Sequence, residues 1–179
     1  DNNRSRGLGD VYKRQKLNIS IVRMTHKEPK FAPKIALYQP DIPQNTASII
    51  RTCSCLGIML EIIEPCGFII NDRKFKRVVM DYYDAKNIQF YKSPEDFFIS
   101  KRNTRIILMT TKSKKSYKEF LFKKNDTVLF GRESSGVPTS VHKKVSHRLT
   151  IPMMNKKRSL NLSSSVSIVV SKILNQINF

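Results

Sequence analysis

Short apolar runs recur along the chain from Lys34 onward, separated by longer stretches with a different spacing of hydrophobic positions. Runs of this length, rich in β-branched and aromatic residues, are typical of buried strands. They predict strands over Ile35–Tyr38, Met59–Ile63, Ile88–Tyr91, Arg105–Met109, Thr127–Phe130 and Arg148–Ile151.

The stretches between these runs favour helices. Over Asn45–Leu56 the apolar residues fall on one helical face, and Gly57 suits the position just after a helix end. Further helices are predicted after Asp72 as a cap, with Phe75, Val78, Val79 and Tyr82 inward; from the Ser93-Pro94 start signal; over Lys114–Phe122; and over Leu160–Ile177.

Strands that alternate with helices predict an α/β fold with a mainly parallel sheet, in which ligands bind beyond the carboxyl ends of the strands. The length of 179 residues suits one domain, which we expect over residues 34–179. Residues 1–33 lack the pattern, and we expect an N-terminal tail there that is disordered or partly non-native.

The amino-acid composition indicates a class of binding partner but does not establish it. The net charge is +19, from 33 Lys and Arg against 14 Asp and Glu, and such a surface attracts a polyanion. A lysine-rich composition also arises from AT-biased coding, so the charge supports RNA binding but does not establish it. No apolar segment is long enough for a membrane span or suggests a signal peptide, so we expect a cytoplasmic protein without a membrane partner.

The three cysteines, Cys53, Cys55 and Cys66, do not predict a metal site. Residues two apart on a helix face different sides, and no second Cys or His pair follows at ligand spacing. Their odd number also argues against a disulfide framework. We therefore expect structural thiols and no bound metal.

Three loops that follow strands carry the chemically distinctive residues. The first, Gln39–Thr46, leads into a helix that carries Arg51, and Asn45 is a candidate cap for that helix. The second, Phe130–Pro138, contains Gly131, which lets the backbone approach a ligand, and a charged Arg132-Glu133 pair. It lacks the Lys-Ser/Thr that a phosphate loop requires.

The third loop joins Ile151-Pro152-Met153 to Arg158–Ser163 and enters the last helix. Ser159 or Asn161 alone is explained as an N-cap. The combined Ser-Leu-Asn-Leu-Ser run is harder to explain by capping. Of the three loops, the second favours a functional role, because a bare turn would not need Arg and Glu together. The first, taken alone, is explained by a strand-to-helix turn that exposes an arginine.

The chain resembles the SPOUT-class RNA 2′-O-ribose methyltransferases, and most closely the small tRNA (cytidine/uridine-34-2′-O)-methyltransferase subfamily. The resemblance covers nearly all of Lys34–Phe179. It rests on four segments in order: Asn45-Thr-Ala-Ser-Ile-Ile-Arg51-Thr-Cys53, Ile63-Glu-Pro-Cys-Gly-Phe68, Phe130-Gly-Arg-Glu-Ser-Ser-Gly-Val-Pro138, and Ile151-Pro-Met153 with Arg158-Ser-Leu-Asn-Leu-Ser163.

This resemblance implies a C-terminal trefoil knot, a homodimer, S-adenosylmethionine as cofactor and methylation of the wobble nucleotide, position 34, in a tRNA anticodon loop. It implies a cofactor pocket lined by Met109, Gly131, Ile151, Ser159 and Leu160. The catalytic set that it implies is Asn45, Arg51, Glu133, Ser159 and Asn161.

Two departures from the family pattern bear on the choice of RNA: Ala47-Ser48 replaces a common Gly-Asn, and Tyr83-Asp84 replaces a common His-Glu. The alternatives are methylation of another tRNA or rRNA site and a non-catalytic RNA-binding protein on the same fold. An unrelated nucleotide-binding enzyme is disfavoured by missing Walker and G-x-G-x-x-G motifs. The family proposal makes Arg51 the proton acceptor, but a guanidinium has no acceptor atom, so phosphate binding is an equal hypothesis.

Overall fold

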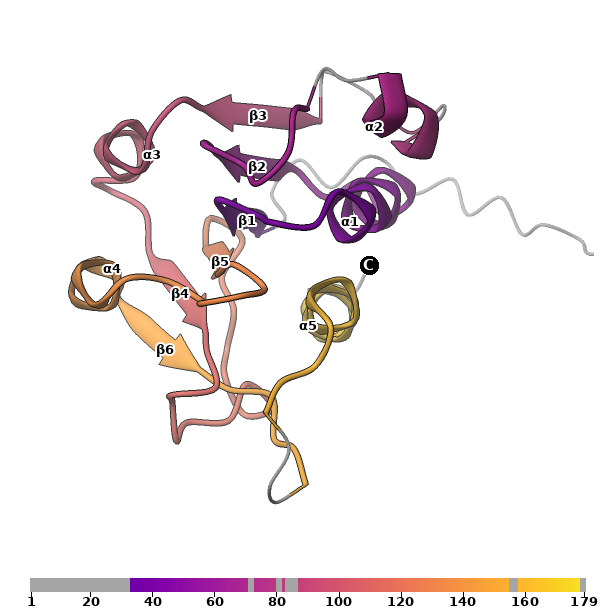
Figure 1. Cartoon of the computed structure of the whole chain (residues 1–179). Coiled ribbons are helices and arrows are strands. Elements are labelled where there is room, and N and C mark those ends of the chain that lie inside the picture. The colour runs from indigo at the N-terminus through magenta and orange to yellow at the C-terminus, as the bar shows by residue number, and fades with distance from the viewer. Residues whose placement is uncertain (1–32, 71–72, 80–81, 83–86, 155–157, 178–179) are drawn as a thin grey trace, which may run out of the picture.

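The computed structural model describes residues 33–70, 73–79, 82, 87–154 and 158–177. Within these ranges a six-stranded sheet has the order β3-β2-β1-β5-β4-β6 (Figure 1). Every pair of neighbouring strands is parallel. The strands are β1 (Lys34–Tyr38), β2 (Leu60–Ile63), β3 (Ile88–Tyr91), β4 (Ile106–Met109), β5 (Thr127–Phe130) and β6 (His147–Leu149).

Helices cover both faces of this sheet, as Figure 1 shows. One face carries α1 (Pro43–Cys55), α2 (Arg73–Val79) and α5 (Leu162–Gln176), and the other carries α3 (Pro94–Ser100) and α4 (Thr139–Lys144). The predicted α/β fold with a parallel sheet is confirmed. The trefoil knot stays a prediction.

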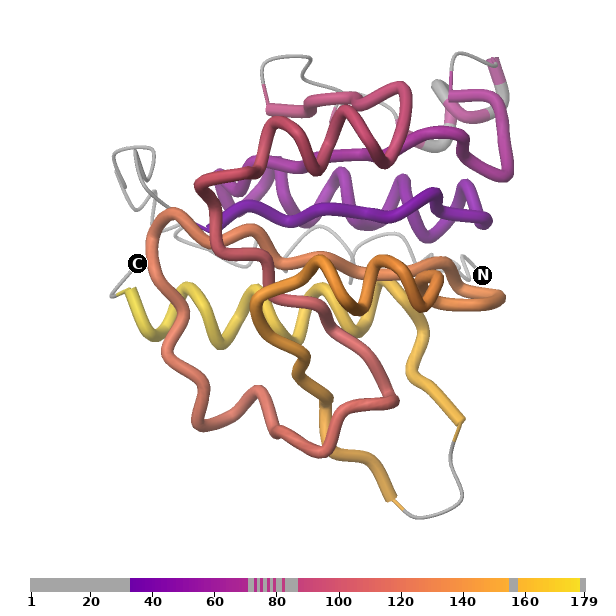
Figure 2. The backbone as a smooth tube through the Cα atoms, turned by 90° about the vertical axis from the view of Figure 1, so that its left-hand side faces the viewer, coloured from indigo at the N-terminus to yellow at the C-terminus, as the bar shows by residue number. Residues whose placement is uncertain are grey.

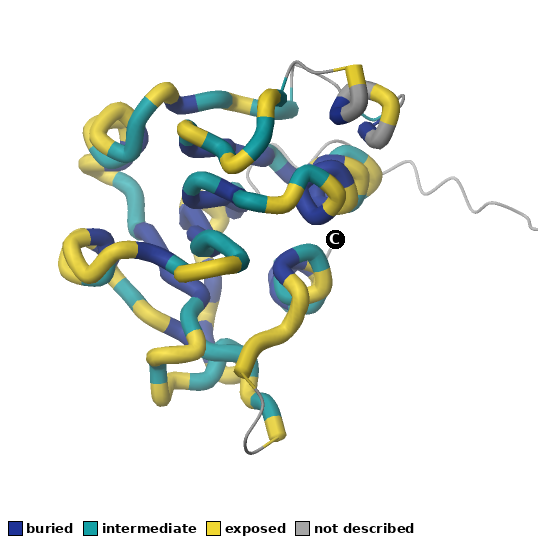
Figure 3. The backbone as a smooth tube through the Cα atoms, viewed as in Figure 1, coloured by how far each residue is buried: buried dark blue, intermediate teal, exposed yellow. Residues whose placement is uncertain are grey.

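The two faces have separate hydrophobic cores, because successive side chains of a strand point to opposite sides. In β1, Ile35 and Leu37 join the core beneath α1 and α5, whereas Ala36 and Tyr38 join the core beneath α3 and α4. Burial on both faces explains why the central strands read as continuous apolar runs. Figure 3 shows the buried strands in the middle and exposed residues on the outer turns of the helices.

The strands lie close to their predicted bounds, and Ser93 caps α3 as expected, accepting a hydrogen bond from the Asp96 amide at 3.1 Å. The helix predicted over Lys114–Phe122 is wrong. There the amide of Tyr117 donates to Thr150 O and the amide of Thr150 donates to Lys115 O. The segment is therefore an irregular connection that is hydrogen-bonded to the residues just after β6. Figure 2 shows it as a long excursion from the sheet.

One ion pair is buried within the smaller core. The Glu61 side chain in β2 is fully buried, and Lys101 Nζ, at the end of α3, lies 2.5 Å from its carboxylate. Burial lowers the pKa of Lys101, and the Glu61 carboxylate opposes that shift. Because the two charges compensate each other, the pair ties α3 to the middle of the sheet.

Parts of the sequence-based predictions lie outside the described residues. These are residues 1–32 of the predicted tail, the Asp72 cap and the Tyr83-Asp84 departure. Of the residues predicted to face inward from α2, Phe75 and Val79 are buried.

Candidate active site

A cavity of about 520 Å³ opens where β4 and β5 end, at their carboxyl edge. It is lined by residues of the three predicted loops: Asn45 on the first, Gly131 and Glu133 on the second, Ile151 and Asn161 on the third. The volume falls within the roughly 300–1,000 Å³ usual for small-molecule sites. The predicted position of the ligand site is therefore where the structure has its cavity.

A chain of hydrogen bonds joins one side chain from each loop. Asn45 Nδ2 donates to Glu133 Oε1 at 3.0 Å, and Asn161 Nδ2 donates to Asn45 Oδ1 at 2.9 Å. The buried amide of Asn45 is thus fixed at both ends. The predicted helix cap by Asn45 is wrong, because α1 already begins at Pro43 with Ile42 before it.

Asn161 serves two purposes at once. Its Oδ1 accepts hydrogen bonds from the amides of Ser163, at 2.9 Å, and Ser164, at 3.3 Å, and so caps α5. With the oxygen committed to the helix end, the Nδ2 group is the atom left to reach Asn45. The cap therefore sets the orientation of the polar chain.

Glu133 clamps the second loop to the first. Its Oε2 accepts from the amide of Asp41 at 2.9 Å, and Asp41 Oδ2 accepts in return from the amide and hydroxyl of Ser134 at 3.2 and 2.6 Å. Arg132, which precedes Glu133 in the sequence, donates to Gln39 Oε1 of the first loop.

The second loop is closed tightly by glycines. The amides of Arg132 and Gly136 each donate to the other residue's carbonyl at 3.0 Å. A Cβ atom on Gly131 would lie 2.6 Å from the Gly136 carbonyl carbon, so the approach of the loop to itself requires glycine at position 131. Gly136 has a φ of 70°, which favours glycine as well.

The first loop contains the one described non-glycine residue with positive φ, Gln39 at 47°. Its Nε2 donates to Glu64 O at 3.2 Å, in addition to the bond that its Oε1 accepts from Arg132. Sparsely populated backbone conformations persist where surrounding contacts hold them, often at functional sites. Gln39 thus links the segment after β2 to the cavity loops.

The residues predicted to hold the cofactor all line the cavity: Met109, Gly131, Ile151, Ser159 and Leu160. The apolar side chains among them suit an adenine ring and the methylene groups beside a sulfonium, and the loops offer backbone groups for the polar ends. This donor set fits S-adenosylmethionine. That these five residues contact the cofactor stays a prediction.

Of the predicted catalytic set, the structure brings Asn45, Glu133, Ser159 and Asn161 to one cavity. Arg51 is not among the residues that line it. Arg51 is exposed on α1, and its guanidinium carbon lies 4.7 Å from the centre of the Tyr82 ring. Arg51 and the cavity are thus separate within one chain.

The sequence interpretation missed two contributors. Asp41 carries the return half of the clamp, and its place directly after a strand was the available signal. His142 of α4 also lines the cavity, and no sequence pattern pointed to it. Burial, and then the charges of Lys112 and Arg148, lower the pKa of His142 below its ordinary value.

Two absences apply to the described residues alone. Among them no group of three or more His, Cys, Asp or Glu side chains is arranged to hold a metal ion. None of the helices in those same ranges is long and apolar enough to cross a membrane.

The fold and cavity define a parallel α/β protein with a small-molecule site at the carboxyl edge of its sheet. The chain belongs to the SpoU rRNA Methylase family, whose model matches residues 32–171. The predicted family resemblance is confirmed by this match.

Named relatives narrow the class. The chain is 41% identical over 145 residues to a tRNA (cytidine(34)-2′-O)-methyltransferase of Beijerinckia indica, covering 80% of this chain and 91% of that protein. It is 33% identical over 147 residues to the enzyme of that name from Escherichia coli K12, covering 81% and 94%.

Solved structures agree on the fold. One, concerned with the 2-OH methylation of C/U34 on tRNA, has a TM-score of 0.78 at 33% identity and covers 84% of this chain and 98% of its own. The SpoU methyltransferase AviRb from Streptomyces viridochromogenes, in complex with AdoMet, has a TM-score of 0.72 at 19% identity, covering 88% and 62%. At that identity the second structure supports the fold alone.

Proposed function

We propose that this protein is an S-adenosylmethionine-dependent tRNA methyltransferase that methylates the ribose 2′-hydroxyl of nucleotide 34, a cytidine or uridine. The observation that carries the proposal is the cavity with its Glu133–Asn45–Asn161 chain, because it unites all three loops of the family pattern. The names of relatives 33% to 41% identical over most of the chain supply the substrate. A tRNA substrate suits a cytoplasmic enzyme.

The cofactor site comprises Met109, Gly131, Ile151, Ser159 and Leu160 in this proposal. When bound there, S-adenosylmethionine supplies an electrophilic methyl group. The chain's own contribution is to hold the target ribose in line with that group, and positioning of this kind accounts for much of the rate of such displacements. The hydrogen bonds that join Glu133, Asn45 and Asn161 give the cavity wall a fixed arrangement of amide groups.

Arg51 is the RNA-side residue in this proposal. A guanidinium stays protonated and has no acceptor, so it binds phosphate and stabilises negative charge that develops on the attacking oxygen. The hydroxyl proton then leaves to solvent. Because Arg51 does not line the cavity of its own chain, we propose that the enzyme is a homodimer in which Arg51 serves the partner's cavity.

Methylation of total tRNA, and of rRNA in a separate reaction, with labelled cofactor, followed by mapping of the modified nucleotide, tests this function. The expected result is a single 2′-O-methylated residue at position 34. Modification of another tRNA nucleotide or of rRNA would contradict the proposed substrate but support the proposed reaction. Good cofactor binding with no incorporation into either RNA would reject the enzyme and leave an RNA-binding protein.

A substitution at Arg51 separates its proposed role in methyl transfer from the binding of the cofactor in the cavity. Arg51→Ala is expected to abolish methylation while leaving the affinity for S-adenosylmethionine unchanged, measured by isothermal titration calorimetry. Full activity of Arg51→Ala would remove Arg51 from the proposed catalytic set.

A further inference from the structure

A row of exposed cations follows the free edge of the sheet. β6 is the last strand in the sheet order and pairs with β4 on one side. The β4–β5 connection beside it has exposed lysines at Lys112, Lys114, Lys115, Lys118, Lys123 and Lys124. Its acidic residues are Glu119, which is exposed, and Asp126, which is buried. The edge therefore carries a strong local excess of positive charge.

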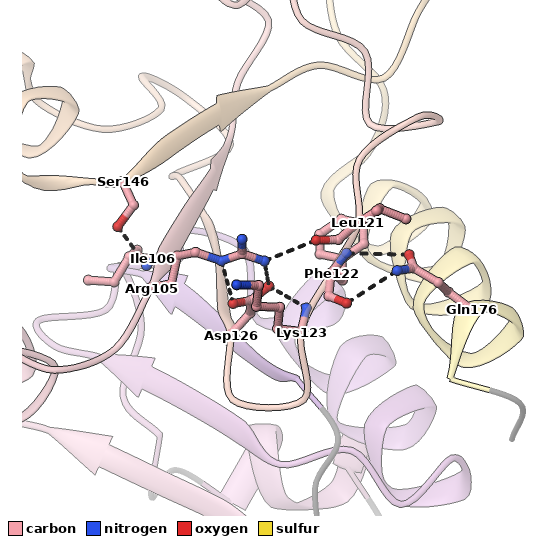
Figure 4. Close-up of polar contacts among 8 residues, drawn as sticks. All are labelled: Arg105, Ile106, Leu121, Phe122, Lys123, Asp126, Ser146 and Gln176. Carbon is pink, nitrogen blue, oxygen red and sulfur yellow. Dashed lines mark hydrogen bonds and ion pairs between the residues drawn. The ribbon is translucent and has the colours of Figure 1, made fainter.

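Side-chain bonds hold this connection in one conformation. Arg105 donates from Nε to Asp126 Oδ1 at 2.7 Å and from Nη2 to Asp126 Oδ2 at 2.6 Å, and the same Nη2 donates to Leu121 O (Figure 4). Gln176 of α5 exchanges two hydrogen bonds with the backbone of Phe122. These bonds fix the part of the connection that leads into β5.

The connection is also fastened to β6 itself. Ser113 Oγ donates to Arg148 O at 2.8 Å, and the amide of Thr150 donates to Lys115 O at 2.8 Å. The cations of the connection and the exposed Arg148 of β6 therefore belong to one surface.

Two groups of cations mark the ends of this surface. At the cavity, Lys112 and His142 are both lining residues, and the charge of Arg148 reaches His142 as well. Farther along, Arg105 and Lys115 lie 5.2 and 5.6 Å from the Phe120 ring centre, and that ring lies 5.1 Å from the His147 ring. The second group includes Lys123, whose charge, after burial and the charges of Arg105 and Lys115, helps to lower the pKa of His147.

We propose that this β6 basic strip, made of Lys112, Lys115, Lys123 and Arg148, binds the sugar-phosphate backbone of the substrate tRNA. It rests on the proposed function and extends it, since it gives the RNA a path that starts at the cavity and follows the edge of the sheet. Lysines on a fixed backbone neutralise successive phosphates and release counterions, which is the main source of sequence-independent affinity.

The test uses K115Q/K123Q, because neither residue lines the cavity. The matched control is K92Q/R102Q, which removes the same charge from exposed residues, one after β3 at the opposite edge of the sheet and one after α3. Affinity for tRNA is measured by filter binding over a series of salt concentrations, in the presence of S-adenosylhomocysteine. Thermal unfolding confirms that both variants fold.

The expected result is a Kd for tRNA that is roughly tenfold weaker at about 0.1 M salt for K115Q/K123Q, with a salt slope lower by about 1 to 2. The control and the charge-retaining K115R/K123R keep the parent values. Equal affinity and slope for K115Q/K123Q and the control would overturn the strip. Because binding needs no turnover, failure of the strip is distinct from failure of the methylation assay, which would overturn the proposed function instead.

Discussion

Asn161 caps α5 with its Oδ1 and donates to Asn45 with its Nδ2, so a substitution can remove one of these two roles and keep the other. Aspartate caps a helix as well as asparagine does, but an ionised carboxylate cannot donate to Asn45 Oδ1. Asn45 cannot turn over to compensate, because its Nδ2 is already bonded to Glu133. We therefore expect N161D to keep the cap of α5 and to lose most methylation activity.

The companion variant N161A removes both roles. It is expected to lower the free energy of unfolding by about 1 kcal/mol through the lost cap, and activity with it. Urea unfolding and initial methylation rates measure the two effects. An active N161D would show that the bond to Asn45 is dispensable and that Asn161 acts as a cap alone.

The cysteines differ in reactivity for a physical reason. Burial raises the pKa of Cys53 to about 12, and burial followed by the Glu64 charge raises that of Cys66 to about 12. At pH 8 the reactive thiolate of either is then a fraction of about 10⁻⁴. We expect a thiol reagent to modify the exposed Cys55 rapidly and the other two slowly, and C55S to abolish the fast phase.

At the scale of elements, α3 is fastened by the Glu61–Lys101 pair. K101M would leave the fully buried Glu61 carboxylate without its closest partner, which is expected to cost about 3–5 kcal/mol. The double variant E61L/K101M replaces both charges by apolar groups and is expected to recover most of that loss. Urea unfolding measures both, and a K101M protein as stable as the parent would contradict this account.

The elements that were predictable from sequence are those with a strong local signal. Continuous apolar runs gave the strands because both faces of the sheet are covered, and Ser93-Pro94 gave α3 because the cap and the fixed φ of proline act locally. Lys114–Phe122 misled because its aromatic residues suggest a helix face. Its backbone instead bonds to Thr150, a partner that no local pattern reveals.

Most of the predicted site residues line the cavity, with Arg51 as the exception, but the bonds between them were not predictable. The family pattern gave Asn45, Glu133 and Asn161, and the structure places all three at the cavity. Their partners could not be foreseen, because the bonds span 88 and 116 positions of sequence. The same holds for Asp41, whose carboxylate meets Ser134 from a distant loop.

At the scale of the whole molecule, the separation of Arg51 from the cavity makes a prediction about paired subunits. If Arg51 serves the partner's cavity, a mixture of R51A and N161D chains regains activity on mixing, because each mixed dimer has one complete site. About half of the parent activity per mixed dimer is expected from this symmetry. If each chain uses its own Arg51, mixed dimers have two defective sites and no activity returns.

The Glu133–Asn45–Asn161 chain also determines when in its synthesis the protein becomes competent. Its members come from the first helix, the loop after β5 and the start of the last helix. The chain must therefore overcome the unfavourable entropy of closing long loops before these side chains can form their hydrogen bonds. A nascent or truncated chain that ends before Asn161 carries all six strands and lacks the third member. We therefore expect unfinished chains to lack methylation activity and completed chains to modify the RNA.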